Sequence, residues 1–289
     1  MENASDKKSM LLLNLAVMLF GLSGTVARLL SASPVAITFG RAACSACLLF
    51  LLLVLKKERL RPARGKDAPL LLLAGAVLAA HWVCFFRAVQ LASVAAGTVT
   101  FSTFPLFLIF LEPLVFKENF KPQNLPFAAA LLLGAAVIAP SASLGDKATA
   151  GVLWGMASSL TYAALTLFNR FFAARYSAVK ICFYEQGAAA LILIPALLLE
   201  KPAVAVWDIA GIAVIGVFCT ALGFSLFVTA QKRVRAQTAG ILSGMETVYG
   251  VLFAFLLLRE APTPREIIGG CVILGATTLF ATRTSHKLR

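Results

Sequence analysis

Charged side chains are scarce in this chain of 289 residues, where Asp, Glu, Lys and Arg together account for 13%. Soluble domains carry about 25% charged residues. The chain is also 60% hydrophobic, and one aqueous globule cannot hide that share of its side chains, because much of a folded chain stays at the surface. The composition therefore excludes a soluble enzyme, a disordered protein and a disulfide-stapled secreted domain.

Residues that build metal and nucleotide sites are also few. The only histidines are His81 and His286, neither has a second set of ligands nearby, and no Walker A motif occurs. All six cysteines fall inside apolar runs, where we expect them as small buried hydrophobic residues. We therefore expect no metal, no other cofactor and no direct use of ATP.

The net charge of +13 does not indicate a nucleic-acid partner, because the basic residues form short clusters between apolar runs and no basic domain. Long apolar runs dominate the chain, and a transmembrane helix needs about 20 apolar residues. We predict an all-α membrane protein with ten transmembrane helices. Their expected ranges are 10–30, 34–55, 68–91, 94–116, 125–142, 148–172, 178–199, 203–230, 236–258 and 264–281.

The basic residues predict the orientation of these helices. With a cytoplasmic N-terminus, 19 of the 26 Lys and Arg residues fall on the cytoplasmic side, 6 fall on the other side, and Arg41 lies inside the second span. Because positively charged short loops stay cytoplasmic, we expect both termini in the cytoplasm. The first apolar run is longer than the about 7–15 residues of a signal-peptide core, so we expect a retained helix.

The two halves of the chain resemble each other. Around Gly97 the first half reads ASVAAGTVTFSTFPLFLIFLEPLVFKE, and around Gly240 the second reads VRAQTAGILSGMETVYGVLFAFLLLRE. Five spans is an odd number, so a second half of the same fold enters the membrane from the other side. This predicts two inverted five-helix repeats, residues 1–144 and 145–289, with a solute site between them near the midplane. The alternative is that apolar helices resemble one another by composition.

These features resemble the drug/metabolite transporter superfamily, and its EamA-type branch in particular. The resemblance rests on the ten spans, the duplication, and the fourth and ninth spans that end in Lys117-Glu118 and Arg259-Glu260, and it covers essentially the whole chain. Many relatives carry Gly before that Glu and Glu-Pro in the ninth span, whereas this chain has Lys117 and Arg259, and a Thr after Glu246. The resemblance implies a carrier of amino acids or other small metabolites in a bacterial plasma (inner) membrane, and it does not identify one solute.

Ionisable groups inside the spans are candidate functional residues, because each costs at least about 2.5 kcal/mol near the bilayer centre. Glu246 stands about halfway along the ninth span, with Tyr249 one turn further on the same face. We predict that Glu246 binds a substrate ammonium, a coupling proton, or both in alternation. The structural alternative is a protonated carboxyl bonded to a neighbouring backbone or hydroxyl group.

Arg41 and Glu185 occupy equivalent positions in the two halves, 144 residues apart. Opposite charges at such positions indicate pairing across the bundle or a clamp for a zwitterion. Two unrelated snorkelling charges are the alternative.

His81 and Trp82 lie in the middle of the third span. Histidine titrates near neutral pH, so His81 is a second candidate for a coupling proton. A packed histidine, hydrogen-bonded across the bundle, is the alternative.

Aromatic residues predict a passage for amphipathic cargo. Pro105 is expected to kink the fourth span at Phe101. Tyr162 and Trp154, both in the sixth span, are further candidate substrate contacts, although Trp154 also suits an interfacial aromatic belt.

Together these residues predict a secondary active transporter that exports small organic metabolites, such as amino acids or amphipathic amines, by alternating access. The expected partners are the solute and the lipid bilayer, with the protein as a monomer or homodimer. The alternatives are an importer of organic cations, nucleobases or other metabolites, an integral-membrane enzyme and a channel. An enzyme would need clustered catalytic groups at one membrane face, and a channel would need a water-lined pore; the sequence offers neither pattern.

Overall fold

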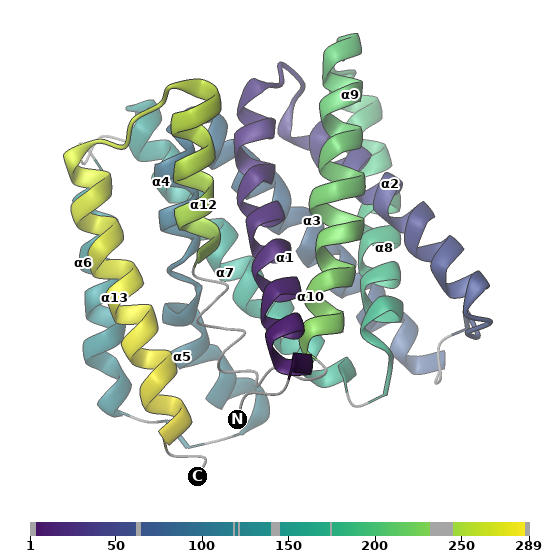
Figure 1. Cartoon of the computed structure of the whole chain (residues 1–289), viewed down its shortest axis with the longest axis horizontal. Coiled ribbons are helices and arrows are strands. Elements are labelled where there is room, and N and C mark those ends of the chain that lie inside the picture. The colour runs from purple at the N-terminus through teal and green to yellow at the C-terminus, as the bar shows by residue number, and fades with distance from the viewer. Residues whose placement is uncertain are drawn as a thin grey trace.

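The computed structural model describes residues 4–61, 65–117, 119–120, 122–139, 145–173, 175–231 and 245–286. Within these ranges every regular element is helical, and in the resulting bundle α1 begins and α13 ends on the same side (Figure 1). The main helices are α1 (Ala4–Leu29), α2 (Pro34–Leu55), α3 (Ala68–Leu91), α4 (Val94–Phe101), α5 (Phe104–Phe116), α6 (Leu125–Ile138), α7 (Lys147–Ala173), α8 (Ala178–Glu200), α9 (Val206–Val214), α10 (Gly223–Gln231), α12 (Met245–Phe253) and α13 (Pro264–His286). Two π-helical segments, η3 (Ile215–Leu222) and η4 (Ala254–Leu258), continue α9 and α12, and short 3₁₀ turns, η1 (Gly65–Asp67) and η2 (Pro122–Asn124), precede α3 and α6.

The predicted all-α class is confirmed for these residues. Seven helical segments are long and apolar enough to cross a membrane, and two shorter apolar segments coincide with the predicted fifth span and with the second part of the predicted ninth. The first part of the ninth span, including Gly240, lies outside the described residues, as do Lys232, Arg233 and Arg235. The count of ten spans stays a prediction.

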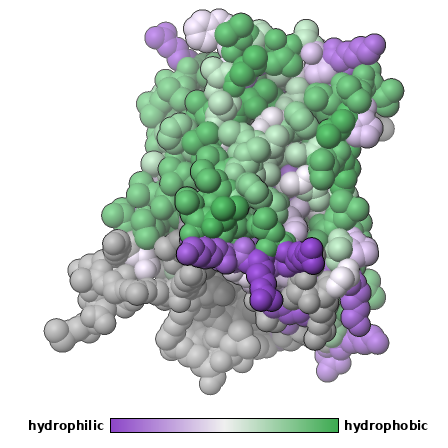
Figure 2. Space-filling view, turned by 90° about the vertical axis from the view of Figure 1, so that its right-hand side faces the viewer, coloured by the Kyte–Doolittle hydropathy of each residue, from purple (hydrophilic) through white to green (hydrophobic). Residues whose placement is uncertain are grey.

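Hydrophobic side chains dominate the outer surface. Figure 2 shows a broad hydrophobic band across the middle of one face, with hydrophilic residues gathered toward its two ends. Large outward-facing side chains include Leu114, Leu191 and Leu256, which are 75%, 66% and 62% exposed. Water would penalise so much exposed apolar surface, whereas lipid accepts it. The chain is therefore a multi-pass membrane protein.

The helix ends follow local sequence signals that recur in both halves. Ser33 caps α2 and Ser177, 144 residues later, caps α8; each hydroxyl accepts a hydrogen bond from a backbone N–H three residues on. At the ends of α5 and η4, Lys117 and Arg259 adopt left-handed backbone conformations, with φ of 54° and 56°. Only Gly takes that conformation without steric cost, and these are the two positions at which the resemblance noted in the sequence implied Gly.

The ends of α2 and α8 touch each other reciprocally. The Ser33 hydroxyl donates to a carboxylate oxygen of Glu200 at 2.9 Å, and the Ser177 hydroxyl donates to one of Glu58 at 2.9 Å. Ser33 precedes α2 and Glu200 ends α8, whereas Ser177 precedes α8 and Glu58 follows α2. The two helices are therefore antiparallel, and each end of the pair is joined by the same kind of bond.

The predicted kink at Pro105 is confirmed as a break between α4 and α5. Pro105 has no N–H to give to the Phe101 carbonyl, and the Ser159 hydroxyl on α7 donates to that carbonyl at 3.1 Å instead. The two residues in the break are also bonded across the bundle, Ser102 to Thr247 on α12 at 2.7 Å and Thr103 to Ser159 at 3.0 Å. Hydroxyl groups of neighbouring helices thus support the break together with local backbone bonds, as an interruption inside a membrane requires.

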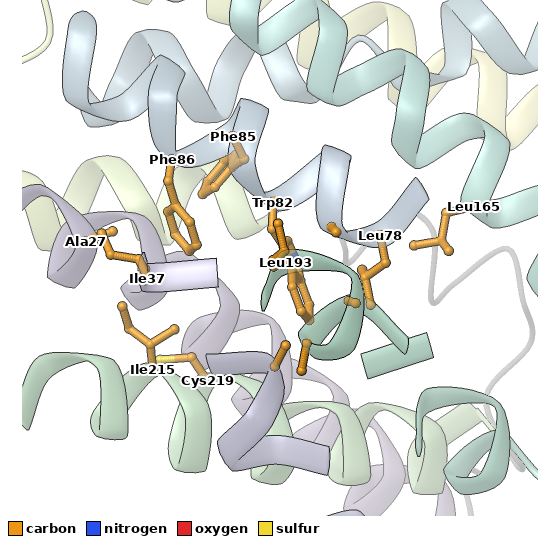
Figure 3. Packing of buried hydrophobic residues seen from close by; sticks show 14 of the residues in the cluster. Ala27, Ile37, Leu78, Trp82, Phe85, Phe86, Leu165, Leu193, Ile215 and Cys219 are labelled. Atoms are coloured by element: carbon orange, nitrogen blue, oxygen red, sulfur yellow. The ribbon is translucent and has the colours of Figure 1, made fainter. Parts of the chain in front are cut away.

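Helix α3 lies at the centre of the bundle, against α7, α8 and α2. Its Trp82, Phe85 and Phe86 pack with Ile37 of α2 and Ile215 of η3 in the main hydrophobic core (Figure 3). This packing holds the middle of α3, where His81 also lies, against the interior of the protein.

Candidate functional site

A cavity of about 400 Å³ lies inside the bundle. This volume suits a small organic molecule. The polar residues that line it are Ser23, Arg41, His81, Tyr162, Thr166, Asn169, Glu185, Gln186 and Glu246. The remaining lining is Phe20, Leu78, Trp82, Phe85, Phe101, Phe104, Leu165, Ala178, Ile181, Cys182, Phe224 and Phe227.

Arg41 on α2 is the one cation among the described residues of this lining, and it is 4% exposed. Its Nε donates to the Thr220 hydroxyl at 3.0 Å and a terminal nitrogen donates to the Ser23 hydroxyl at 3.3 Å. The guanidinium carbon lies 4.0 Å from the centre of the Trp82 ring, which favours a cation over its face. Thr220 belongs to the π-helical segment η3, and such segments are frequent at functional sites.

Glu185 and Gln186 on α8 also line the cavity, and they are 4% and 1% exposed. Within the described parts of the chain, an oxygen of each side chain is buried without a hydrogen-bond partner, as is the Oδ1 atom of Asn169 on α7. Close approach of α3 holds this part of α8 in place: a Cβ at Gly75 would lie 2.8 Å from the Glu185 carbonyl oxygen. A larger residue at Gly75 would therefore push α8, which carries Glu185, away from α3.

Arg41 and Glu185 line the same cavity but do not pair. No ion pair joins Arg41 to either cavity carboxylate among the residues that the structure describes. Of the two arrangements predicted from their equivalent positions, pairing therefore does not occur between these two residues in this structure, and a clamp for a zwitterion stays a prediction.

His81 on α3 is held through one ring nitrogen. Its Nδ1 lies 2.9 Å from the Ser158 hydroxyl and 3.0 Å from the Ser158 carbonyl oxygen, both on α7. A carbonyl oxygen can only accept, so a proton on Nδ1 satisfies that contact and makes Nε2 an acceptor in the neutral ring. The Nδ1 side of the ring is thus hydrogen-bonded across the bundle, as the packed-histidine alternative expects, and His81 also lines the cavity.

The predicted aromatic lining is present. The ring centres of Phe101 and Tyr162 are 5.0 Å apart in an edge-on arrangement, and Phe104 lies 5.1 Å from Tyr162 in the same geometry. The His81 ring centre is 5.3 Å from Phe101 and 5.0 Å from Tyr162. Trp82 supplies the face against Arg41. These rings give the cavity an apolar wall beside its charged one.

Glu246 on α12 lines the cavity, but Tyr249 does not. The Tyr249 hydroxyl donates to the side-chain oxygen of Asn14 on α1. The reason is the close approach of α1 and α12, where a Cβ at Gly21 would lie 2.8 Å from both the Glu246 carbonyl oxygen and the Tyr249 Cβ. The side chains of residues three apart on a helix point about 60° away from each other. The same rotation of α12 can therefore direct Tyr249 toward α1 and Glu246 toward the cavity.

Trp154 also lies away from the cavity lining and is 40% exposed. It precedes Tyr162 by eight residues, about 12 Å along α7, so it sits at a different depth. Its exposure suits the interfacial belt that we considered as the alternative.

Several cavity residues were missed by sequence reasoning. Gln186 and Asn169 of the lining, and Thr220, which bonds Arg41, are polar residues within apolar helices, as Glu185 is, so the signal used for charged groups would have found them. Phe20, Phe224 and Phe227 could not have been found, because 22 phenylalanines are spread along the chain. Within the described ranges, no group of three or more His, Cys, Asp or Glu residues is placed to hold a metal.

One end of the cavity reaches the connection between α7 and α8, since Asn169 near the end of α7 and Ala178 at the start of α8 line it.

Polar bonds of Arg28, near the end of α1, hold this helix end against the connection between α3 and α4 and against Glu260, which follows η4. Arg28 donates to the carbonyl oxygens of Gln90 and Ala92, the second at 3.1 Å, and its Nε lies 3.7 Å from a carboxylate oxygen of Glu260.

A helical membrane bundle around a cavity with charged and aromatic walls defines the class of a membrane transporter. Comparison with family models agrees. The chain belongs to the EamA-like transporter family, whose model matches residues 7–139 and again residues 149–282. The resemblance inferred from the sequence is therefore confirmed, and the family domain occurs twice.

Curated relatives carry transporter names. An "Uncharacterized transporter" of Archaeoglobus fulgidus is 29% identical over 69% of this chain and 71% of its own length. A pseudopaline exporter of Pseudomonas aeruginosa is 26% identical over 93% of this chain and 94% of its own. A "Probable terminal-alkyne amino-acid exporter" of Streptantibioticus cattleyicolor is 23% identical over 79% of this chain and 78% of its own.

A solved structure that is 17% identical covers 96% of this chain and 99% of its own, with a TM-score of 0.66. At this identity the likeness concerns the fold alone.

Proposed function

We propose that this protein is a secondary active transporter that exports small organic metabolites, such as amino acids or amphipathic amines. The observation that carries the proposal is the cavity wall, where Arg41, Glu185 and Glu246 lie without ion pairs to one another in the described parts of the chain. Buried charges without partners are costly, so a solute with groups of both signs would be stabilised there.

The roles follow from chemistry. Glu246 holds the solute's ammonium group, or a coupling proton in its place, and Arg41 holds a carboxylate, for which its planar donors are suited. The aromatic wall of Phe101, Tyr162 and Trp82 receives the apolar body. His81, with Nε2 turned to an acceptor, is the second candidate for the coupling proton.

We further propose two inverted five-helix repeats, residues 1–144 and 145–289, in ten spans. The twofold family match supports this, as do the reciprocal bonds Ser33–Glu200 and Ser177–Glu58. The excess of basic residues in the loops supports cytoplasmic termini. The membrane is a bacterial plasma (inner) membrane, and the protein acts as a monomer or homodimer.

Export is supported by two observations. Two relatives are named as exporters. The cavity also reaches the α7–α8 connection, which the distribution of Lys and Arg assigns to the cytoplasm, so a solute can load from that side.

Proteoliposomes with the purified full chain test the proposal. A panel of amino acids, amines and nucleobases is loaded on one side, and counterflow and net efflux are measured. We expect saturable counterflow of at least one zwitterionic solute, with none in liposomes without protein. Unsaturable conductance would indicate a channel, net uptake alone would indicate an importer, and no movement of any solute by folded protein would contradict the proposal.

A further inference from the structure

The charges of the cavity do not balance. Among the described lining residues, one guanidinium, Arg41, faces two carboxylates, Glu185 and Glu246. A solute with one ammonium and one carboxylate would use Glu246 and Arg41 and leave the Glu185 carboxylate buried alone. An isolated buried charge is expensive, so the described part of the lining lacks one positive group when such a solute is bound.

The surroundings of Glu185 indicate where that group would lie. Glu185 is 4% exposed, and its Oε1 has no hydrogen-bond partner among the residues that the structure describes. The next residue, Gln186, is 1% exposed and its Oε1 also has none. Buried acceptors in proteins are nearly always paired, so two unpaired acceptors on adjacent residues that line one cavity indicate a missing donor among the described residues.

The missing donor has a definite chemistry. An ammonium group offers three N–H donors and a positive charge, so it supplies donors for such acceptors and neutralises the carboxylate. Asn169, whose Oδ1 is buried without a partner, supplies a further acceptor on the same cavity wall. A neutral hydroxyl could satisfy one acceptor but not the charge.

We infer that Glu185 and Gln186 form a second cation subsite, so that the preferred solutes carry two ammonium groups and one carboxylate. This inference rests on the proposed function, because it takes Glu246 and Arg41 as the sites of the first ammonium and the carboxylate. Glu185 discriminates among solutes by net charge, favouring a net charge of +1 over neutral zwitterions of the same length.

L-lysine and L-norleucine are the probes, because they share backbone and chain length and differ in the terminal ammonium. Titration calorimetry on the purified full chain measures both dissociation constants. In the wild type we expect lysine to bind at least about tenfold more tightly, since a hydrogen bond to a charged group is worth that much in affinity. In Glu185→Gln we expect the ratio of the two constants to fall to about one.

The matched control is Glu200→Gln, which removes a carboxylate from the same helix outside the cavity lining. It is expected to keep the wild-type ratio. Gln186→Leu leaves the carboxylate in place and is expected to reduce the ratio by a few fold, which gives a second test if Glu185→Gln folds poorly.

The outcomes separate this inference from the proposed function. Norleucine binding as tight as lysine binding in the wild type would overturn the second subsite and leave the transporter proposal intact. The same holds if neither probe binds while another zwitterion shows counterflow. If Glu185→Gln keeps the ratio but removes the pH dependence of counterflow, then Glu185 carries a proton and the inference is wrong. No counterflow of any solute would remove both.

Discussion

The two halves of this chain make matching side-chain contacts at the ends of α2 and α8, but they carry opposite charges at equivalent positions of the cavity. At the ends, Ser33 bonds Glu200 and Ser177 bonds Glu58, so one contact occurs twice with the halves exchanged. At the cavity, the equivalent positions carry Arg41 in one half and Glu185 in the other.

A second pair of side-chain contacts near helix ends also occurs twice with the two halves exchanged. Asp208 accepts from the Ser31 backbone and hydroxyl, both at 2.8 Å, while Asp67 accepts from Arg175 at 3.0 Å and from the Tyr176 hydroxyl at 2.9 Å. Ser31 and Arg175 are 144 residues apart, as Arg41 and Glu185 are.

Equivalent contacts therefore recur at the helix ends, whereas equivalent positions at the cavity, where we propose that a solute binds, carry opposite charges. A symmetric cavity would place like charges at equivalent positions, and like charges repel. An organic solute with unlike ends is better matched by unlike walls. The predictions below therefore expect large effects on transport from the cavity and smaller effects, on stability, from the ends.

The largest effect is expected from Glu246→Gln. The substitution keeps the shape of the side chain and removes the charge that we propose holds the solute's ammonium, so counterflow of a transported zwitterion should fall at least about tenfold. Proteoliposome counterflow measures it, with Glu112→Gln as a control carboxylate outside the cavity. Unchanged transport in Glu246→Gln would remove the central role from this residue.

Arg41→Lys is expected to come next. The substitution keeps the positive charge but loses the planar donors, two of which now bond Thr220 and Ser23, and the contact with the Trp82 face. We expect affinity for a carboxylated solute to fall about tenfold, and to fall less for the matching amine without a carboxylate. Equal losses for the two solutes would show that Arg41 supports the cavity rather than binding the carboxylate.

Asp67→Asn and Asp208→Asn test the matched ends. Asp67 is 3% exposed and its carboxylate accepts from two side chains, so loss of its charge should destabilise the protein by about 1–3 kcal/mol. Asp208→Asn should lower the free energy of unfolding by a similar amount, because Asp208 is 2% exposed and its carboxylate also accepts two hydrogen bonds from Ser31. Thermal unfolding in detergent measures both. A large loss in only one variant would contradict the equivalence of the two ends.

The smallest effect is expected from Glu112→Gln. Glu112 pairs with Arg170, but their side chains are 42% and 48% exposed, and exposed pairs contribute about 0–1 kcal/mol. The melting temperature should change by no more than a degree or two. A drop as large as that of Asp67→Asn would mean that Glu112 has a further structural role.

Much of the helical architecture was predictable because it depends on runs of apolar residues. The second and third spans, 34–55 and 68–91, end where the structure ends α2 and α3. The kink at Pro105 was predictable for a covalent reason, since proline lacks the N–H that the Phe101 carbonyl needs. The identity of the replacement donor, Ser159, was not, because it lies on a helix 58 residues away.

The candidate site was predictable in its charges and less so in its members. Glu246, Arg41, Glu185 and His81 were found because ionisable groups inside apolar helices are costly. Tyr249 lies one turn from Glu246 and was expected beside it, but it bonds Asn14 instead. Two residues three apart on a helix point about 60° away from each other. The contacts with neighbouring helices set the rotation of the helix and thereby determine which of the two side chains faces the cavity.

The amino-acid sequence by itself determined that the chain is helical, where most helices begin and end, and that it belongs in a membrane, since each depends on neighbouring residues and on overall composition. Only the tertiary structure decided that Arg41 and Glu185 share a cavity without pairing, and that Gln186 and Asn169 join them there. These facts depend on the rotation and depth of whole helices against one another, which packing contacts such as those at Gly21 and Gly75 set across long distances in the chain.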